Sequence, residues 1–214
     1  MNDNREKKHN IVLIGFMGTG KSTVGKKLAA RLRYAYLDTD AEVERVTGLT
    51  IPQIFDRFGE VRFRSEESLV AQKVAAMERA IVSTGGGIVL NRANIDALGS
   101  TGILIRLSAR PEVIWSRVAR RTHRPLIKKD ISPEDIEGMM AVREPYYGCA
   151  DLDVDTSERT VPEIVEYILD FLNRREGEDW RPLPEETEEG KVIDESSYDR
   201  KPADSADDRD GRTG

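Results

Sequence analysis

The sequence predicts a three-layer α/β/α domain around a central parallel sheet of about five strands. Short apolar runs, rich in β-branched residues and bounded by glycine or polar turns, predict buried strands. Stretches with helical periodicity separate these runs, and they are long enough to form the crossover connections that parallel strands require. The predicted strands cover residues 11–14, 34–37, 80–83, 102–107 and 152–155.

Local signals place three of the helices between and after these strands. Val24, Leu28 and Leu32 recur every four residues after the first strand and form one apolar helix face. Ser132, followed by a proline and two acidic residues, is typical of a helix start. Residues 160–163 have the spacing of a capping box before the last apolar pattern, which predicts a final helix.

The composition changes near residue 175, which divides the chain into a core and a tail. Residues 175–214 hold 14 acidic, 7 basic and only 7 hydrophobic residues, so this segment carries a charge of −7. The whole chain carries −6, which leaves residues 1–174 close to neutral. A segment so poor in apolar residues cannot offset its chain entropy by burial. We expect a domain over residues 1–174 and a disordered acidic tail, or an acidic interaction arm, over residues 175–214.

Rare residue types and net charge exclude several classes of protein. One cysteine and two histidines exclude a disulfide scaffold and a zinc site built from cysteine and histidine. No apolar run approaches the length of a membrane span, and the polar start lacks the apolar stretch of a signal peptide. The net negative charge disfavours nucleic-acid binding. We therefore expect a cytoplasmic protein without nucleic-acid or membrane partners.

The strongest motif is GFMGTGKS at residues 15–22, which matches the pattern G-x-x-x-x-G-K-[ST] between the first strand and the first helix. Glycines let successive backbone N–H groups point into one concavity, and the helix N-terminus adds its positive dipole end. Lys21 can then reach the β- and γ-phosphates, and the Ser22 hydroxyl can bind Mg²⁺. Such a match arises by accident in roughly one chain of this length in a hundred. The motif predicts a nucleoside triphosphate site, and the chain lacks the N-K-x-D pattern of GTPases.

Two acidic residues, Asp38 and Asp40, follow the second predicted strand. In open α/β sheets, ligands bind beyond the carboxyl ends of the strands. One carboxylate can face Mg²⁺, and the other can orient an acceptor hydroxyl and take its proton. A helix N-cap is an equally good interpretation, because aspartate caps helices well.

Three later segments have features of a phosphate and anion site. Arg64 lies in a charged segment entering a helix, where its planar fork could hold a carboxylate, although such charges often form a solvated face. The glycines at residues 85–87 expose backbone N–H groups to a ligand or form a flexible turn. Residues 117–129 are rich in basic residues and lack the aromatic residues that stack on RNA bases, and Arg143 ends a predicted helix.

Together these segments resemble the shikimate kinase family over about residues 10–174. The resemblance implies a P-loop kinase fold with a mobile lid at about residues 117–131. At position 127 an isoleucine replaces the leucine that usually ends the lid motif. Six motifs occur in the family's order: the Met-Gly-x-Gly-Lys core at 17–21, D-x-D at 38–40, G-E-x-x-F-R-x-x-E at 59–67, the triple glycine at 85–87, R-P-L at 124–126 and R-x-P-x-Y at 143–147.

For ATP and its metal ion, the resemblance implies contacts from the phosphate loop and the lid. Lys21 and Arg124 would neutralise charge on the transferring phosphoryl group, and Arg117 would stack on adenine near residues 155–157. Mg²⁺ would bind Ser22 directly and Asp38 through water. The implied ATP-binding set is Gly18, Thr19, Gly20, Lys21, Ser22, Thr23, Arg117 and Arg124.

For shikimate, the resemblance implies one acid and two arginines as the principal contacts. Asp40 would orient the acceptor hydroxyl and act as base, while Arg64 and Arg143 would hold the carboxylate. Two glycines near the ring oxygens and an acid that orients Arg64 complete the implied set: Gly86, Gly87 and Glu67.

The activity implied by the resemblance is ATP-dependent phosphorylation of the 3-hydroxyl of shikimate, a step of chorismate and aromatic amino acid biosynthesis. We expect a monomer that uses Mg²⁺ and has only these small molecules as partners. Two alternatives stay open at this point: a kinase of another small hydroxy acid or polyol, and a non-catalytic nucleotide-binding module.

Overall fold

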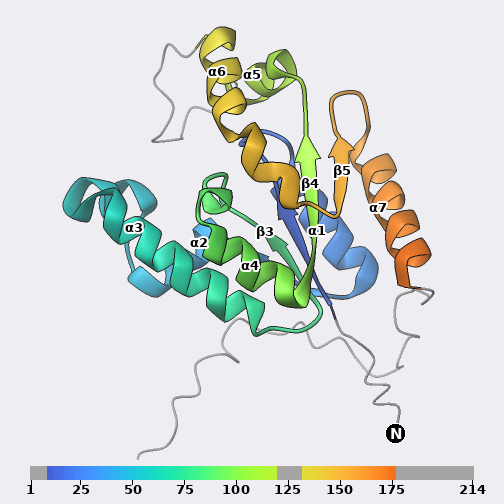
Figure 1. Ribbon diagram of the computed structural model, residues 1–214, viewed down its shortest axis with the longest axis horizontal. Helices are drawn as coiled ribbons and strands as arrows, with labels where there is room; N and C mark the ends of the chain where they lie inside the picture. Colours follow the sequence, from blue (N-terminus) through green and yellow to red (C-terminus); the bar gives the residue numbers. More distant parts are fainter. Residues whose placement is uncertain (1–8, 120–131, 177–214) are drawn as a thin grey trace, which may run out of the picture. The chain divides into compact units, whose positions relative to one another are not determined.

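Five parallel strands form one sheet in the order β2-β3-β1-β4-β5. Figure 1 labels β3, β4 and β5 of this sheet among the helices that surround it. The computed structural model describes residues 9–119 and 132–176. Each predicted strand is confirmed to within one residue at either end. The strands are β1 Asn10–Ile14, β2 Ala35–Asp38, β3 Ala80–Ser83, β4 Gly102–Ser108 and β5 Leu152–Asp155.

Helices cover both faces of this sheet, which confirms the predicted three-layer α/β/α class. The α-helices are α1 Lys21–Leu32, α2 Thr39–Thr47, α3 Ile51–Ala75, α4 Arg92–Thr101, α5 Pro111–Ala119, α6 Pro133–Arg143 and α7 Val161–Glu176. Two short 3₁₀ helices, η1 Ile88–Leu90 and η2 Glu144–Cys149, join them. None of the helices in the described part of the chain combines the length and apolar character needed to cross a lipid bilayer.

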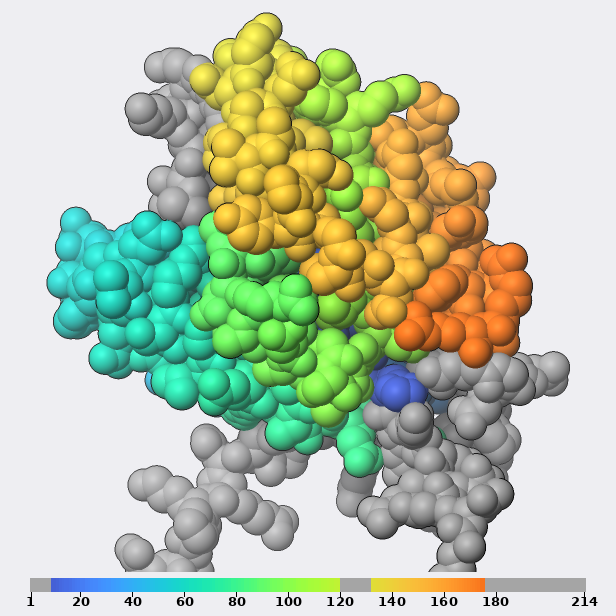
Figure 2. Space-filling model, viewed as in Figure 1, coloured from blue at the N-terminus to red at the C-terminus, as the bar shows by residue number. Residues whose placement is uncertain are grey.

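Two apolar cores, one on each face, hold the layers together. Side chains alternate along β1, so Ile11 and Leu13 pack toward α1 and α7 while Val12 and Ile14 pack toward α3 and α4. The space-filling view shows α3 and α4 side by side over the second face (Figure 2). Because both faces are covered, β1 is apolar along almost its whole length rather than alternating.

The two helix starts predicted at Ser132 and at Thr160 are confirmed. The hydroxyl of Ser132 accepts a hydrogen bond from the backbone N–H of Asp135, whose carboxylate accepts one from the N–H of Ser132. At α7, the carboxylate of Glu163 accepts hydrogen bonds from the backbone N–H and the hydroxyl of Thr160. The pair at Ser132 is a complete capping box, whereas at α7 the Thr160 hydroxyl donates to Glu163, so the box predicted there is only half formed.

The segment that begins at Gly59 enters a helix as predicted, and another helical segment directly precedes it. The helix α3 begins eight residues earlier, at Ile51, behind a capping box formed by Thr50 and Gln53. Gly59 interrupts this helix with φ 76° and ψ 179°, a conformation open almost only to glycine. The residues that follow it, including Arg64, therefore belong to the second half of a long, broken helix.

The predicted functional motifs lie at the edge of the sheet where the strands end. The chain leaves β1 toward β2 and β3 on one side and reaches β4 and β5 on the other, so the carboxyl ends of β1 and β4 flank the topological switch point. The phosphate loop follows β1, Asp38 ends β2 and the triple glycine follows β3. Residues 120–131 and 177–214 lie outside the described residues, so the predicted lid and acidic tail stay predictions.

Candidate active site

The phosphate loop connects β1 to α1 through three glycines with positive φ. Gly15, Gly18 and Gly20 have φ values of 139°, 81° and 97°. A Cβ atom at Gly15 would overlap the carbonyl oxygen of Leu107, whereas one at Gly20 would lie in open space. The helix α1 has no side-chain N-cap, so its first N–H groups are available to an anion.

The side chain of Lys21 folds back over the phosphate loop. Its ammonium group donates hydrogen bonds to the carbonyl oxygens of Gly15, at 2.7 Å, and of Phe16, at 2.9 Å. The residue is only 9% exposed, so the loop carbonyls take the place of water around a buried charge. The ammonium group is thereby held inside the concavity that the sequence predicted for phosphate.

Ser22 and Asp38 meet beside the start of α1. The Ser22 hydroxyl donates to Oδ2 of Asp38 at 3.0 Å, and the hydroxyl of Tyr36 donates to the same oxygen at 3.4 Å. The other carboxylate oxygen, Oδ1, accepts from the backbone N–H of Asp40 and caps α2. The helix-cap interpretation of Asp38 is therefore confirmed, and its second oxygen lies on the side of Ser22.

These oxygen atoms fit a small divalent cation. Mg²⁺ prefers hard oxygen ligands, and it is commonly held by one or two protein groups together with substrate phosphates. In the described ranges, 9–119 and 132–176, no three residues drawn from His, Cys, Asp and Glu gather as a metal cage. The pair formed by Ser22 and Asp38 is the arrangement expected for a cation that arrives with a nucleotide.

Asp40 lies against the first of the three glycines that follow β3. A Cβ atom at Gly85 would overlap Oδ1 of Asp40, so only glycine allows this approach. The backbone N–H of Gly85 donates to the hydroxyl of Thr39, which is fully buried, at 2.8 Å. Thr39 thereby fixes the distance between the start of α2 and the triple glycine, a role that no motif indicated.

Arg64 reaches the third glycine from α3. A Cβ atom at Gly87 would lie 2.5 Å from its Nη1 atom. Arg64 donates from Nη1 to Glu67 at 2.9 Å and from Nε and Nη2 to Glu60 at 3.2 and 3.1 Å. The predicted contact between Glu67 and Arg64 is therefore confirmed, and Glu60 is a second partner that the sequence analysis missed.

Glu67 is the most buried of the acidic side chains near this site. Its side chain is 2% exposed. Burial raises the pKa of Glu67 above its ordinary value, and the negative charge of Asp40 adds to this, although the hydrogen bond from Arg64 and the charge of Arg143 work in the opposite direction. The shift indicates that Glu67, Asp40 and the two arginines share one electrostatic environment.

Arg143, the last residue of α6, completes the group at the middle glycine. Its Nη1 atom donates to the carbonyl oxygen of Gly86 at 3.2 Å, and its guanidinium group lies 5.1 Å from the ring centre of Phe16. A Cβ atom at Gly86 would lie 3.6 Å from the backbone nitrogen of Met17 in the phosphate loop. The three predicted substrate side chains thus meet along one glycine strip that touches the phosphate loop.

Arg117 lies on the other side of the phosphate loop, on α5. It donates to the carbonyl oxygen of Gly18 at 3.3 Å, and to the hydroxyl and the carbonyl oxygen of Thr156 at 3.0 and 2.7 Å. Thr156 in turn donates to the carbonyl oxygen of Thr19 at 3.1 Å. The predicted nearness of Arg117 to residues 155–157 is confirmed, whereas Arg124 lies outside the described residues.

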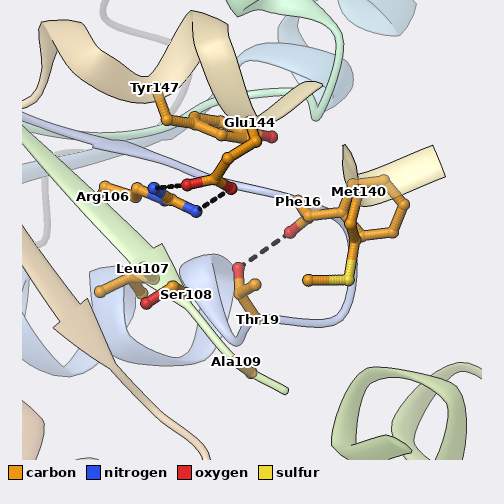
Figure 3. A pocket seen from close by; sticks show the side chains of 9 residues that line it. All are labelled: Phe16, Thr19, Arg106, Leu107, Ser108, Ala109, Met140, Glu144 and Tyr147. Atoms are coloured by element: carbon orange, nitrogen blue, oxygen red, sulfur yellow. Dashed lines mark hydrogen bonds and ion pairs between the residues drawn. The ribbon is translucent and has the colours of Figure 1, made fainter. Parts of the chain in front are cut away.

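A small cavity of about 40 Å³ opens between the phosphate loop and the end of α6 (Figure 3). It has room for a few water molecules. Arg106 and Glu144 form two parallel hydrogen bonds at its wall, beside Tyr147 and Phe16. The only signal for this pair in the sequence is a charged residue inside the apolar run of β4.

Comparison with known proteins agrees with this geometry. The family model for shikimate kinase matches residues 17–173. A shikimate kinase of Pelotomaculum thermopropionicum is 50% identical over 163 residues, which cover 76% of this chain and 95% of that protein. One of Desulforudis audaxviator is 46% identical over 166 residues, covering 78% and 87%.

A solved structure has the same fold. The structure described as shikimate kinase from Acinetobacter baumannii in complex with shikimate has a TM-score of 0.76 and 33% identity, and covers 81% of this chain and 97% of that one. The matched region of the present chain includes residues 17–22 of the phosphate loop, the triple glycine and Arg143. On the strength of the family model and of these close relatives, the chain belongs to the shikimate kinase family.

Proposed function

We propose that the protein transfers the γ-phosphoryl group of ATP to the 3-hydroxyl of shikimate. The observation that carries the proposal is the meeting of Asp40, Arg64 and Arg143 along the glycine strip 85–87, in contact with the phosphate loop. The family match and the relative in complex with shikimate support the choice of substrate. An uncharged polyol would offer no carboxylate to the N–H donors that Arg64 and Arg143 direct toward the glycine strip.

The arginines would hold the carboxylate of shikimate. A guanidinium group carries five N–H donors, and Arg64 gives three of them to Glu60 and Glu67. One N–H on each terminal nitrogen is left for a bidentate carboxylate. The two acids also fix the plane of the fork, so less side-chain freedom is lost when the substrate binds.

Asp40 would hold the reacting hydroxyl. A carboxylate beside the acceptor orients its oxygen toward the phosphorus and accepts the hydroxyl proton as the O–P bond forms. The lack of a side chain at Gly85 keeps Asp40 close to the strip. The protein contributes mainly position and charge, because phosphoryl transfer needs little covalent help.

Lys21 would supply positive charge to the transferring group. Its ammonium group is bonded to two loop carbonyls, and a bound triphosphate offers it oxygens of higher negative charge in the same concavity. Arg124, outside the described residues, is proposed as a second positive charge on the basis of the R-P-L motif alone. Arg117 is proposed to stack on the adenine ring from its place on Gly18 and Thr156.

Ser22 and Asp38 are the residues that would hold Mg²⁺, Ser22 directly and Asp38 through water. When bound, this ion would neutralise charge on the β- and γ-phosphates. The hydrogen bond between the two residues supports this assignment, because it brings both oxygens to one place beside the phosphate loop.

The test is a transfer assay with purified protein, ATP and Mg²⁺. Shikimate is compared with D-gluconate, which has a carboxylate on an open chain, and with glycerol, which has none. We expect phosphorylation of shikimate, with product formation detected directly and not only ADP release. Folded protein that fails to phosphorylate shikimate, or that prefers glycerol, would refute the proposal.

A further inference from the structure

Arg106 is a charged residue near the carboxyl end of β4, in the middle of the molecule. It pairs in register with Ile14, the last residue of β1, and with Asp153 of β5. Its side chain is 15% exposed. A guanidinium group this far from water is costly unless it is fully paired, and Arg106 finds its partners on two different elements.

The principal partner is Glu144, which is 38 residues away and starts η2. Nη1 of Arg106 donates to Oε1 at 2.8 Å, and Nη2 donates to Oε2 at 2.6 Å, as Figure 3 shows. This is the bidentate geometry in which a guanidinium group fixes both the position and the plane of a carboxylate. Nη1 also lies 3.1 Å from Oδ2 of Asp153, and the guanidinium group lies 4.7 Å from the ring centre of Tyr147.

The ionisation of the pair follows its geometry. The hydrogen bond from Arg106 lowers the pKa of Glu144 below its ordinary value. Burial by itself would lower the pKa of Arg106, but the hydrogen bond to Glu144 and the charge of Asp153 outweigh it, so that pKa is raised. Both groups are therefore charged over the neutral pH range.

The Arg106–Glu144 pair is next to the proposed substrate site along the chain. Arg143 directly precedes Glu144 and is the last residue of α6. Its guanidinium group contacts Gly86 on one side and the Phe16 ring on the other. Phe16 lines the same small cavity as Arg106 and Glu144. The Phe16 ring therefore lies between Arg143 and the Arg106–Glu144 pair.

We propose that Arg106 is a positioning residue for substrate binding, which holds Glu144 against the sheet and thereby sets where Arg143 points. This inference rests on the proposed function, because it concerns how Arg143 meets the shikimate carboxylate. Arg106 has a rigid support, because its strand β4 lies between β1 and β5 and is hydrogen-bonded on both sides. The Arg106–Glu144 pair and the buried ring of Tyr147 both hold the start of η2, next to the end of α6, in place.

A purely electrostatic role for Glu144 predicts the opposite result from a positioning role. Glu144 is a negative charge next to an arginine that binds an anion. If only charge mattered, Glu144→Gln would strengthen shikimate binding, and Arg106→Lys would leave it unchanged because the positive charge is kept. If position matters, both changes weaken binding, because each loses the two-point fork.

The experiment measures shikimate binding to the full-length protein without nucleotide, by titration calorimetry, and KM for shikimate and ATP. The variants are Glu144→Gln, Arg106→Lys and, as a control, Asp96→Asn on α4. Asp96 is as exposed as Glu144 and pairs with Arg92 at 2.7 Å within α4. Thermal melts are recorded for every variant.

We expect Glu144→Gln and Arg106→Lys to raise Kd and KM for shikimate about fivefold or more, with KM for ATP changed less than twofold. Asp96→Asn should leave all three constants unchanged. Unchanged or tighter shikimate binding in the two variants overturns the positioning role, and so does an equal loss of shikimate and ATP affinity that follows a lower melting temperature. If the wild-type protein itself fails to bind shikimate, the proposed function fails, and this inference fails with it.

Discussion

The hydroxyl of Ser22 and the carboxylate of Asp38 are hydrogen-bonded at 3.0 Å, which joins the first turn of α1 to the residue that caps α2. One side chain thus serves two purposes. Oδ1 of Asp38 holds the backbone of α2, on which Asp40 lies, and Oδ2 faces the phosphate loop. The proposed cation site and the proposed acceptor site are therefore linked through a single carboxylate.

Asp38→Asn separates these two purposes. Asparagine caps helices about as well as aspartate, so the free energy of unfolding should change by less than about 1 kcal/mol. The loss of charge should raise the Mg²⁺ concentration for half-maximal activity about tenfold. A Mg²⁺ titration of the initial rate, with a thermal melt beside it, measures both. An unchanged Mg²⁺ requirement would remove Asp38 from the proposed metal site.

Lys21→Ala should lower kcat by a factor on the order of 10³ or more. The substitution removes the only side-chain cation that the described phosphate-loop segment, residues 15–22, brings into its own concavity. Steady-state rates at saturating ATP and shikimate give the effect. Turnover near that of the wild type would contradict the role of Lys21.

Arg64→Lys should weaken shikimate binding far more than ATP binding. Lysine keeps the charge but cannot satisfy Glu60, Glu67 and a carboxylate with a planar fork. KM for shikimate should rise about tenfold or more, while KM for ATP should stay within about twofold. Parallel losses for both substrates would show that Arg64 supports the fold rather than the shikimate site.

Gly87→Ala tests the close approach of Arg64 to the glycine strip. The new Cβ atom would lie 2.5 Å from Nη1 and 2.9 Å from Nη2 of Arg64, so the tip of this side chain must move. We expect KM for shikimate to rise about tenfold with a loss of stability of about 1 kcal/mol or less, because a side-chain tip yields easily.

Gly138→Ala on α6 is the matched control for that change. A Cβ atom there meets nothing within 4 Å, and alanine favours a helix over glycine by about 1 kcal/mol. This variant should melt at a slightly higher temperature and bind shikimate normally. If Gly87→Ala also binds shikimate normally, the position of Arg64 does not depend on the absence of a side chain at residue 87.

Stability at acid pH should depend on Glu42. Its carboxylate joins α2 to α3 by accepting hydrogen bonds from Arg45 and from Lys73, at 2.8 to 2.9 Å. The hydrogen bond from Arg45, followed by that from Lys73, outweighs burial and lowers the pKa of Glu42 from 4.5 to about 2. A pKa lower in the folded state means that the stabilisation is complete above about pH 5 and is lost as the pH falls toward 2.

Glu42→Gln should therefore cost about 2 kcal/mol of unfolding free energy at pH 7, and the difference from the wild type should shrink as the pH falls from 4.5 toward 2. Denaturant melts at a series of pH values measure this difference. Glu137→Gln, at an exposed position on α6, gives the effect of the amide substitution alone. A difference for Glu42→Gln that does not decrease at low pH would refute the proposed ionisation.

The sequence by itself predicted the features that depend on local chemistry. Apolar runs bounded by turns predicted all five strands to within one residue, because burial on both faces demands that pattern. The spacing of Gly15, Gly20, Lys21 and Ser22 predicted the phosphate loop, since few other functions need glycines followed by a lysine between a strand and a helix. The capping residues Ser132 and Thr160 predicted two helix starts, because their partners are three residues away.

The tertiary structure alone decided which side chains meet. Asp40, Arg64 and Arg143 come from three helices, and they share one strip of glycines only because β3 lies beside β1 in the sheet. The pair of Arg106 and Glu144 spans 38 residues, and the sequence marks only Arg106, as a charge within an apolar run, and not its partner. Hydrogen bonds within a turn are fixed by local spacing, whereas contacts across the sheet depend on the strand order, which is set by the packing of the whole domain.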